Sequence, residues 1–239
     1  MDLKEIDILG AGIETHWYYR SKANAMERLL SDTSPSIILD VGAGSGFFSR
    51  KLLSKTAAKE AWCVDISYEE ELDAVEAGKP VYFRKSIDEL SADLVLLMDV
   101  LEHVDDDIGL LSHYAEKVPS GARFLISVPA FQFLWSGHDI FLEHKRRYKL
   151  NQLEHVAKRA GLTVTKTSYY FGAVFPIAAT MRLFSNLVRN DRNKARSQLS
   201  QHNPIVNEAL AAMSLAELPF FSHNRLAGLT AFCVAQKDR

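Results

Sequence analysis

Residues 39–48 read LDVGAGSGFF, and they place three glycines at alternate positions just behind a short apolar run. That run, residues 37–39, suits a central strand of a parallel sheet, because such a strand is covered on both faces. Glycine has no Cβ, so Gly42, Gly44 and Gly46 permit positive φ angles and a close approach of the backbone to a ligand. A glycine-rich turn between a buried strand and a helix usually cradles a nucleotide-like ligand. The stretch therefore predicts an α/β fold that binds such a ligand.

Length and composition limit the alternatives. The 239 residues, 47% apolar and 24% charged, suffice for one sizeable soluble domain. A net charge of −2 argues against nucleic acid as a partner. The two cysteines, Cys63 and Cys233, stand among apolar residues and are expected to be buried thiols in a reducing cytoplasm. The start of the chain, MDLKEIDILGAG, lacks a basic flank before an apolar stretch, so we expect no signal peptide.

Strand-like and helix-like segments alternate along most of the chain. Aromatic and apolar residues over 14–31 predict an amphipathic helix before the core, and residues 67–70 match a capping box that opens another helix. Alternation of this kind predicts a doubly wound sheet that binds ligands at the carboxyl ends of its strands. The expected strands are 37–39, 61–64, 81–83, 94–98, 124–128, 162–171 and 229–234, with helices over 45–53, 105–118, 151–161 and between the last two strands.

The segment 169–188 carries a single charge, Arg182, and is long enough to raise the question of a membrane span. Gly172, Pro176 and two polar residues interrupt it, and its first part resembles the end of a strand. A lid or core helix is therefore favoured. A weak contact with a membrane surface through residues 172–190 stays open as an alternative.

The pattern of glycines chooses between nucleotide classes. A phosphate-binding P-loop would end in Gly-Lys-Ser/Thr, which is absent. The dinucleotide fingerprint would need glycine where Phe47 stands. The stretch 40–46 instead reads acid, then G-x-G-x-G, and resembles motif I of the class I S-adenosylmethionine-dependent methyltransferases. By that resemblance Asp40 orients the amino group of the methionine moiety, and the cofactor lies against Gly42, Ala43, Gly44 and Gly46. The alternative is a turn that serves only the packing of the sheet.

Two further positions point to the nucleoside part of the cofactor. Asp65 ends the second expected strand, where a carboxylate can accept hydrogen bonds from both ribose hydroxyls. Dinucleotide enzymes use an acid similarly, so Asp65, with Ile66 beside it, indicates a ribose without choosing the cofactor; a helix N-cap is the alternative. The family commonly has an acidic residue near the adenine amino group. Here Ser86 takes that position, Ile87 would pack on the adenine, and Asp88 is the alternative acid.

Residues 96–107, LLMDVLEHVDDD, resemble the segment after the fourth strand in the methyltransferases of ubiquinone and menaquinone biosynthesis. The resemblance implies that Asp99 and Val100 line the cofactor pocket and that Glu102 and His103 face the acceptor. His103 is then a candidate general base, since a neutral imidazole titrates near working pH. A structural histidine bonded to Glu102 or to a loop carbonyl is the equally weighted alternative.

The segment after the fifth strand is long and has no clear periodicity, which in a compact domain indicates function. It resembles a bacterial methyltransferase subgroup with P-A-x-x-x-L-W-S-x-H-D followed by H-x-R-R-Y. His138, Asp139 and His144 could suggest a metal site, but no third ligand arrives at helical spacing. We therefore assign His138 and His144 to orientation or proton transfer and predict no metal.

The same segment supplies candidate groups for binding the acceptor. Arg146 and Arg147 could bind a carboxylate or phosphate through paired hydrogen bonds, with Tyr148 and Trp135 nearby and Trp17 reaching in from the first helix. These residues and the apolar stretch that follows suggest an anionic or amphipathic small molecule. The alternative is that one arginine pairs with Glu143 or Asp139 and merely fixes the loop.

Element order and resemblance together predict a cytoplasmic S-adenosylmethionine-dependent methyltransferase that releases S-adenosylhomocysteine. Its fold would be a doubly wound, Rossmann-like sheet of seven mostly parallel strands, the last one antiparallel, with a helical cover. A cofactor-binding module without turnover and an NAD(P)-dependent oxidoreductase are the alternatives. The chain is expected to be one domain made of a helical cover (1–35), a cofactor core (36–171) with an acceptor loop (129–150), a helical lid (172–225) and a final strand (226–239).

Overall fold

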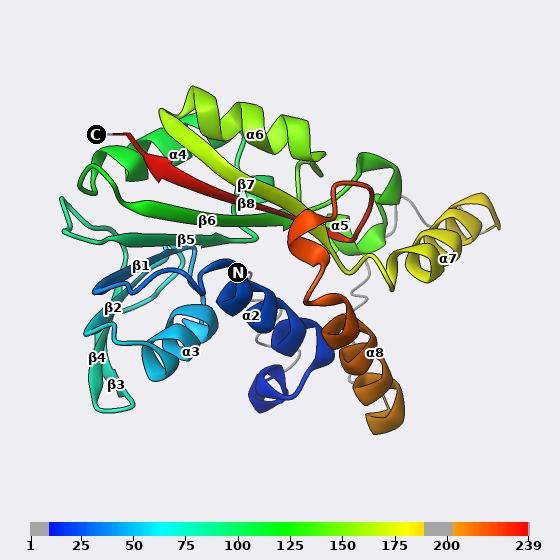
Figure 1. The fold of residues 1–239 in the computed structure, drawn as a ribbon, viewed down its shortest axis with the longest axis horizontal. Helices are drawn as coiled ribbons and strands as arrows, with labels where there is room; N and C mark the ends of the chain where they lie inside the picture. The colour runs from blue at the N-terminus through cyan, green and yellow to red at the C-terminus, as the bar shows by residue number, and fades with distance from the viewer. Residues whose placement is uncertain (1–9, 189–202, 239) are drawn as a thin grey trace.

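A computed structural model describes residues 10–188 and 203–238 and shows an eight-stranded sheet flanked by helices (Figure 1). The strand order is β3-β4-β2-β1-β5-β6-β8-β7. The run from β4 to β6 is parallel throughout, and β8 is antiparallel to both of its neighbours. The doubly wound fold with an antiparallel last strand is confirmed. The strands are β1 (Ile37–Val41), β2 (Glu60–Val64), β3 (Leu72–Glu76), β4 (Lys79–Arg84), β5 (Leu94–Met98), β6 (Arg123–Pro129), β7 (Leu162–Tyr170) and β8 (Thr230–Lys237).

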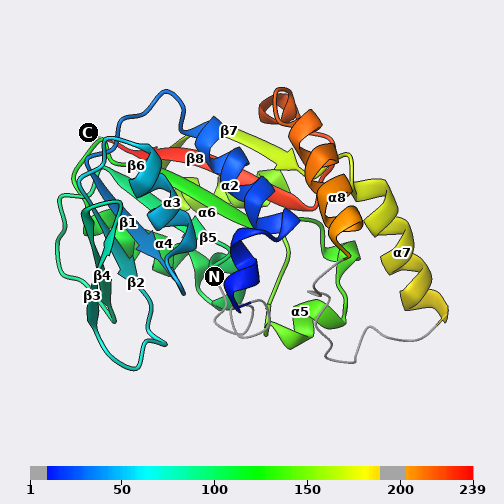
Figure 2. The same cartoon turned by 90° about the horizontal axis from the view of Figure 1, so that it is seen from below.

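The sheet separates two apolar cores. On one face Ile38 and Leu96 pack against the helices α2 (Trp17–Leu29) and α3 (Phe47–Lys55), which lie in front of the sheet in Figure 2. Side chains alternate along a strand, so the residues next to these in sequence point to the other face. There they pack against α4 (Asp107–Glu116) and α6 (Leu150–Arg159). All five residues of β5 are buried, as a strand covered on both faces requires. The two expected cysteine thiols are free and buried.

The prediction that residues 67–70 open a helix is wrong. Those residues form turns, and the chain continues into β3, which pairs antiparallel with β4 and adds the eighth strand. The hairpin is closed by Ala77 and Gly78, whose φ angles of 51° and 77° are those of a type I′ turn. The capping box only permits a helix, and the pairing of this segment with β4 decides the outcome.

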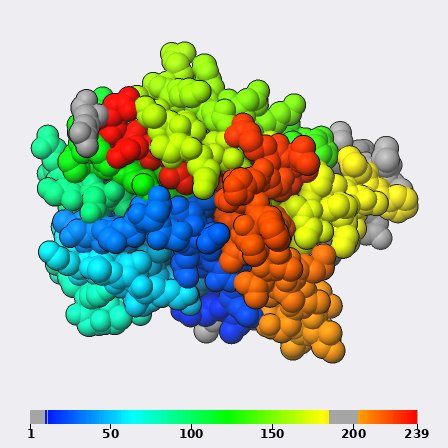
Figure 3. Space-filling view, in the orientation of Figure 1, coloured from blue at the N-terminus to red at the C-terminus, as the bar shows by residue number. Residues whose placement is uncertain are grey.

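The chain between β7 and β8 forms the helices α7 (Phe175–Val188) and α8 (Pro204–Glu217). Helix α8 is tied to α2, since Asn207 accepts a hydrogen bond from the Trp17 amide at 2.8 Å and Glu208 pairs with Arg20. Helix α7 extends away from the body (Figure 3). Among the described residues no helix is both long and apolar enough to cross a membrane. Residues 189–202 of the expected lid lie outside the described residues, as do 1–9 of the expected helical cover and Arg239 of the final segment.

Five shorter helices complete the described chain. Four of them are η1 (Gly10–Glu14), η2 (Leu101–His103) and η3 (Gln132–Leu134), with α5 (Gly137–Phe141) inside the expected acceptor loop. A turn of 3-10 helix, η5 (Phe221–His223), precedes the last strand. Because β1, β2, β5 and β6 are parallel, the segments that follow them meet at one edge of the sheet. The candidate site is built from these segments.

Candidate functional site

The glycine turn follows β1 and leads into α3. Gly42, Gly44 and Gly46 have φ angles of 63°, 54° and 70°, which glycine adopts without strain. A Cβ on Gly42 would lie 2.7 Å from Cγ2 of Val100, and one on Gly46 would lie 2.9 Å from Sγ of Cys63. Two of the three glycines are thus required by packing of the turn against neighbouring strands. The contact of the turn with a cofactor stays a prediction.

Asp40 lies in β1 on the face that carries α3, and its side chain is buried. Its Oδ2 atom has no hydrogen-bond partner among the described residues. Burial raises the pKa of Asp40 to about 6, although a hydrogen bond from Ser49 opposes the shift. A buried carboxylate with an unsatisfied oxygen is a site for a cation.

Asp65 holds the glycine turn in place. Its Oδ2 accepts a hydrogen bond from the Gly44 amide at 3.1 Å, and its Oδ1 accepts one from the Ser67 amide at 2.9 Å. The Tyr68 hydroxyl donates to the Gly44 carbonyl at 2.6 Å from the other side. Ile66 is exposed. No helix begins at Asp65, because turns and bends follow it, so the N-cap alternative does not apply. A ribose contact of Asp65 stays a prediction.

Ser86 and Ile87 lie in the loop after β4. Ser86 is exposed, while Ile87 is half-buried against the core on the α4 face. The Lys117 ammonium donates to the Ile87 carbonyl at 2.5 Å and fixes the loop. The assignment of both residues to the adenine stays a prediction.

Asp99 follows β5 with a φ of 58°, unusual for a residue with a side chain. It forms an ion pair with Lys22 of α2, whose side chain is fully buried, and accepts a hydrogen bond from the Tyr18 hydroxyl at 3.3 Å. Burial by itself raises the pKa of Asp99, but the Lys22 ammonium outweighs it, so the pKa lies below its usual value. Helix α2 is thereby joined to the loop where Val100 packs on the glycine turn.

Lys22 was missed in the sequence. The signal was a lone charge on the apolar face of the expected helix, spaced from Tyr18 and Met26 by one turn on either side. A lysine there must snorkel to solvent or find a buried partner. Its partner is distant in sequence.

Glu102, His103 and His144 form a cluster beside Asp99. Their nearest ligand atoms all lie within 4.8 Å of one another, and the two imidazole rings meet edge to face with centroids 4.8 Å apart. Burial, and then the charge of Asp99, raises the pKa of Glu102 well above its usual value. Burial and the neighbouring His144 lower the pKa of His103 to about 4, so His103 is neutral at neutral pH.

The expected acceptor loop is bound together by its own charged residues. The Arg147 guanidinium is buried and contacts both oxygens of Asp139, at 2.6 and 3.0 Å. Arg146 donates to the carbonyls of Val104 and Asp105, at 3.1 and 2.8 Å. The alternative in which one arginine pairs with Asp139 therefore describes Arg147.

The remaining candidates are placed as follows. Tyr148 is buried with its hydroxyl 2.7 Å from Oδ2 of Asp107, so it belongs to the core on the α4 face. Trp17 packs edge to face on Phe171, with ring centroids 5.4 Å apart. Trp135 is half-buried after η3, and burial, with the charge of Arg182, lowers the pKa of His138 to about 3.

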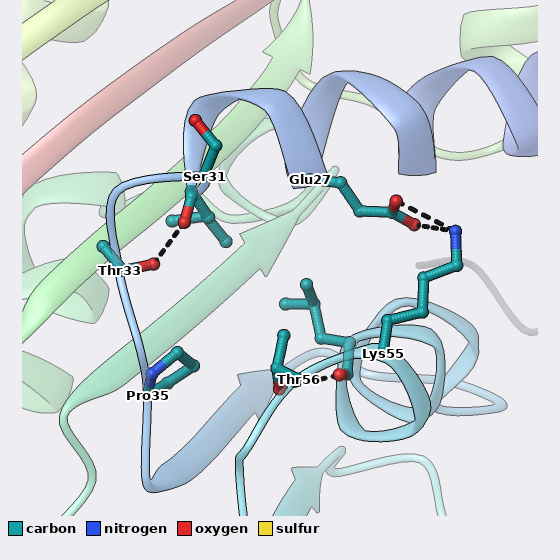
Figure 4. A pocket seen from close by; sticks show the side chains of 8 residues that line it. Glu27, Ser31, Thr33, Pro35, Lys55 and Thr56 are labelled. Atoms are coloured by element: carbon teal, nitrogen blue, oxygen red, sulfur yellow. Dashed lines mark hydrogen bonds and ion pairs between the residues drawn. The ribbon is translucent and has the colours of Figure 1, made fainter.

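A separate pocket of about 220 Å³ lies at the opposite end of β1 and is shown in Figure 4. Its two charged residues, Glu27 and Lys55, are paired with each other at 2.7 Å. It is remote from the glycine turn, which follows the other end of β1. The lining consists of Glu27, Leu30, Ser31, Thr33, Pro35, Leu52, Lys55 and Thr56.

Comparison with known proteins identifies the family. A model of the methyltransferase domain matches residues 15–167, more than half of the chain. The chain belongs to the methyltransferase family. The ubiquinone biosynthesis O-methyltransferase of Nitrosomonas europaea is 26% identical over 165 residues, which cover 59% of this chain and 69% of that protein.

Solved structures agree with the fold of this methyltransferase. A chain from the complex of the Haloferax volcanii Trm112 methyltransferase activator with a methyltransferase superposes with a TM-score of 0.58 at 17% identity, over 92% of this chain and 91% of that one. Phosphoethanolamine N-methyltransferase 2 of Haemonchus contortus, solved with S-adenosylmethionine, gives 0.56 at 15% identity, over 96% and 57%. At these identities the likeness concerns the fold alone.

The enzyme uses S-adenosylmethionine, which supplies an electrophilic methyl group on its sulfonium. The residues present fit this group, since the unsatisfied oxygen of Asp40 offers a partner for an ammonium beside the glycine turn. Phe47, which replaces the third glycine of a dinucleotide site, is buried against Tyr19 at the start of α3. The oxidoreductase alternative and the module without turnover are set aside.

Proposed function

We propose that this methyltransferase transfers the methyl group to an oxygen atom of an amphipathic small molecule. The observation that carries the proposal is the position of Asp99 between two chemically different walls. Tyr18, which contacts Asp99, stacks on Phe171 with ring centroids 5.2 Å apart. Asp99 also lies near the cluster of Glu102, His103 and His144: its charge raises the pKa of Glu102, and His144 lowers the pKa of Asp99.

The two walls suit different parts of one acceptor. Aromatic side chains bind a flat or apolar body. A neutral imidazole such as His103 can accept the proton of a hydroxyl, and a hydroxyl is a poor nucleophile until that proton leaves. Since the methyl donor is already activated, holding the oxygen in line with it supplies much of the rate. The curated relative acts, by its name, on oxygen.

The anionic part of the expected acceptor has less support than the apolar part. Arg146 and Arg147, the groups expected to bind an anion, are bonded to loop carbonyls and to Asp139. Helix α7, in contrast, exposes Ile177, Met181 and Phe184 at 53%, 67% and 67%, on one helical face. We include in the proposal a weak contact of this face with a membrane surface, where an amphipathic acceptor would reside. Residues 189–190 of the expected contact lie outside the described chain.

Vesicle flotation tests the membrane contact. We expect the wild type to float with liposomes and the double variant Met181→Glu, Phe184→Glu to stay in the aqueous fraction. Ile205→Glu on α8, where the side chain is 80% exposed, serves as the matched control. Equal flotation of all three proteins contradicts the contact. The free, buried Cys63 and Cys233 are consistent with the reducing cytoplasm that we propose as the site of action.

Transfer of a labelled methyl group from S-adenosylmethionine into a cell extract tests the reaction. We expect label in an organic-soluble product that resists mild alkali, as an ether does and a methyl ester does not. Gly44→Val should label nothing, because its side chain would occupy space at the turn where the cofactor is expected, whereas Gly78→Val places the same change, also at a positive φ, in the distant β3–β4 hairpin. Label confined to alkali-labile or water-soluble cationic products would refute oxygen methylation of an amphipathic acceptor.

A further inference from the structure

Glu102 is the one fully buried carboxylate among the described residues for which neither side-chain oxygen has a hydrogen-bond partner. Buried carboxylates are otherwise paired, hydrogen-bonded or bound to a metal. No arginine or lysine of the described chain forms an ion pair with it. The described residues therefore supply no partner for the Glu102 carboxylate, and a bound ligand or ion could be that partner.

His144 is oriented like a metal ligand. Its Nδ1 lies 3.0 Å from Oδ1 of Asp139, so the carboxylate holds the proton on Nδ1 and leaves the lone pair on Nε2. Asp139 is itself fixed at two points by Arg147. A carboxylate that orients an imidazole in this way is a regular companion of metal-binding histidines.

His103 completes the cluster. Its ring meets that of His144 edge to face, with ring centroids 4.8 Å apart. His103 and Glu102 come from η2 after β5, while His144 comes from the segment after α5. An unsatisfied carboxylate, an oriented imidazole and a second imidazole thus converge from two loops.

We propose that Glu102, His103 and His144 bind a divalent transition-metal ion such as Zn²⁺. Two imidazole nitrogens and one carboxylate oxygen form a donor set that suits Zn²⁺, Co²⁺ or Fe²⁺, whereas Mg²⁺ prefers oxygen ligands alone. The donor atoms lie within 4.8 Å of one another. Bonds near 2.1 Å require them to draw together by roughly 1 Å, which small side-chain rotations supply.

The site also suggests a role, and that role rests on the proposed oxygen methylation. Three protein ligands leave a coordination position open. With the metal bound, His103 is a ligand in place of a base. An acceptor hydroxyl at the open position would lose its proton to solvent water more readily, because the metal stabilises the resulting oxyanion. The oxygen then holds the electron pair that forms the new bond to the methyl carbon, while the pair of the broken bond stays on sulfur.

Metal binding by the full chain tests the site without reference to any acceptor. The protein is stripped with chelator, dialysed and titrated with Zn²⁺, Co²⁺ or Mg²⁺ by calorimetry, and Co²⁺ is also followed by its visible spectrum. We expect one Zn²⁺ or Co²⁺ per chain and at least tenfold weaker binding of Mg²⁺. Glu102→Gln and His144→Ala should each weaken Co²⁺ binding by at least tenfold. His113→Gln, a change at an exposed histidine of α4, should leave it unchanged.

A thermal melt separates loss of a ligand from loss of the fold. Glu102→Gln keeps the side-chain shape and removes a buried carboxyl group that has no partner, so the stripped variant should melt no lower than the stripped wild type. Zn²⁺ should raise the melting temperature of the wild type and not that of the variant. Failure of the wild type to bind Zn²⁺ and Co²⁺, tighter binding of Mg²⁺, or equal binding by all variants would overturn the metal site. The labelling of an extract judges oxygen methylation separately.

Discussion

Arg147 and Asp139 form a buried ion pair with two contacts, Nε to Oδ1 at 2.6 Å and Nη2 to Oδ2 at 3.0 Å. The same carboxylate accepts hydrogen bonds from the Ser136 amide at 2.8 Å and from His144. One aspartate therefore fixes the start of α5, the guanidinium and the imidazole together. The loop after β6 is a rigid frame that points His144 towards the end of β5.

Arg147→Met should lower the free energy of unfolding by about 3–5 kcal/mol, because it leaves Asp139 charged, buried and short of partners. Arg147→Lys should lose less, since it keeps the charge but lacks the planar fork. Arg123→Met, which breaks the more exposed pair with Asp32, should cost about 1 kcal/mol or less. Urea unfolding measures all three. A loss for Arg147→Met no larger than that for Arg123→Met contradicts the prediction.

Lys22 and Asp99 provide a second test of a buried pair. Lys22→Met should lower the free energy of unfolding by about 3 kcal/mol, the low end of the range for buried pairs, since the Asp99 side chain is 22% exposed. The double variant Lys22→Met, Asp99→Asn should regain much of this loss, because no unpaired charge remains. Urea unfolding of both single variants and the double variant gives the coupling energy. If the loss in the double variant equals the sum of the losses in the two single variants, the two residues act independently.

Gly46 can be compared with Gly78, because both have positive φ angles, 70° and 77°. Gly78→Ala should cost about 1–2 kcal/mol, the strain of a left-handed residue, since nothing lies within 4 Å of the added Cβ. Gly46→Ala should cost more, because its Cβ would lie 2.9 Å from Sγ of the buried Cys63. Thermal or urea unfolding compares them. Equal losses would mean that packing does not require glycine at position 46.

The fold followed from local patterns because its strands are short, buried and separated by helices. Residues 94–98 could be placed without error, since an unbroken apolar run between turns has few other structures. The hairpin of β3 and β4 was missed because residues 67–70 satisfy a helix cap that the backbone never uses. Local sequence could not decide between the two, as pairing with β4 is a tertiary effect.

Only those parts of the candidate site whose residues are close together in the sequence could be predicted. The glycine turn and Asp40 are contiguous, so their meeting follows from the strand-turn-helix pattern. Lys22, Asp99 and His144 come from three distant segments, and spacing along the chain carries no information about such contacts. For the same reason a search for metal ligands at helical spacing around His144 could not reach Glu102.

Asp40 should make stability depend on pH in a defined window. Its folded pKa of about 6 lies above the ordinary aspartate value of 3.8, so the native state holds this proton more tightly than the unfolded state. Below pH 3.8 the burial carries no charge penalty. Between pH 3.8 and 6 stability falls as pH rises, by roughly 3 kcal/mol in total, and above pH 6 this contribution is constant. Asp40→Asn removes the penalty, so the difference in unfolding free energy between wild type and variant should change over that window. A difference independent of pH contradicts the prediction.

The same group should control cofactor affinity. An ammonium beside Asp40 favours the ionised carboxylate, so binding releases the proton that burial retains below pH 6. S-adenosylhomocysteine should therefore bind the wild type about fivefold more weakly at pH 5 than at pH 6, and with little change from pH 7 to 8. Asp40→Asn should bind more weakly at pH 7 and lose the dependence between pH 5 and 6. Calorimetry in buffers of different ionisation enthalpy checks both the affinity and the number of protons released. If the variant keeps the pH profile of the wild type, the titrating group is another residue, and the methionine ammonium does not bind at Asp40.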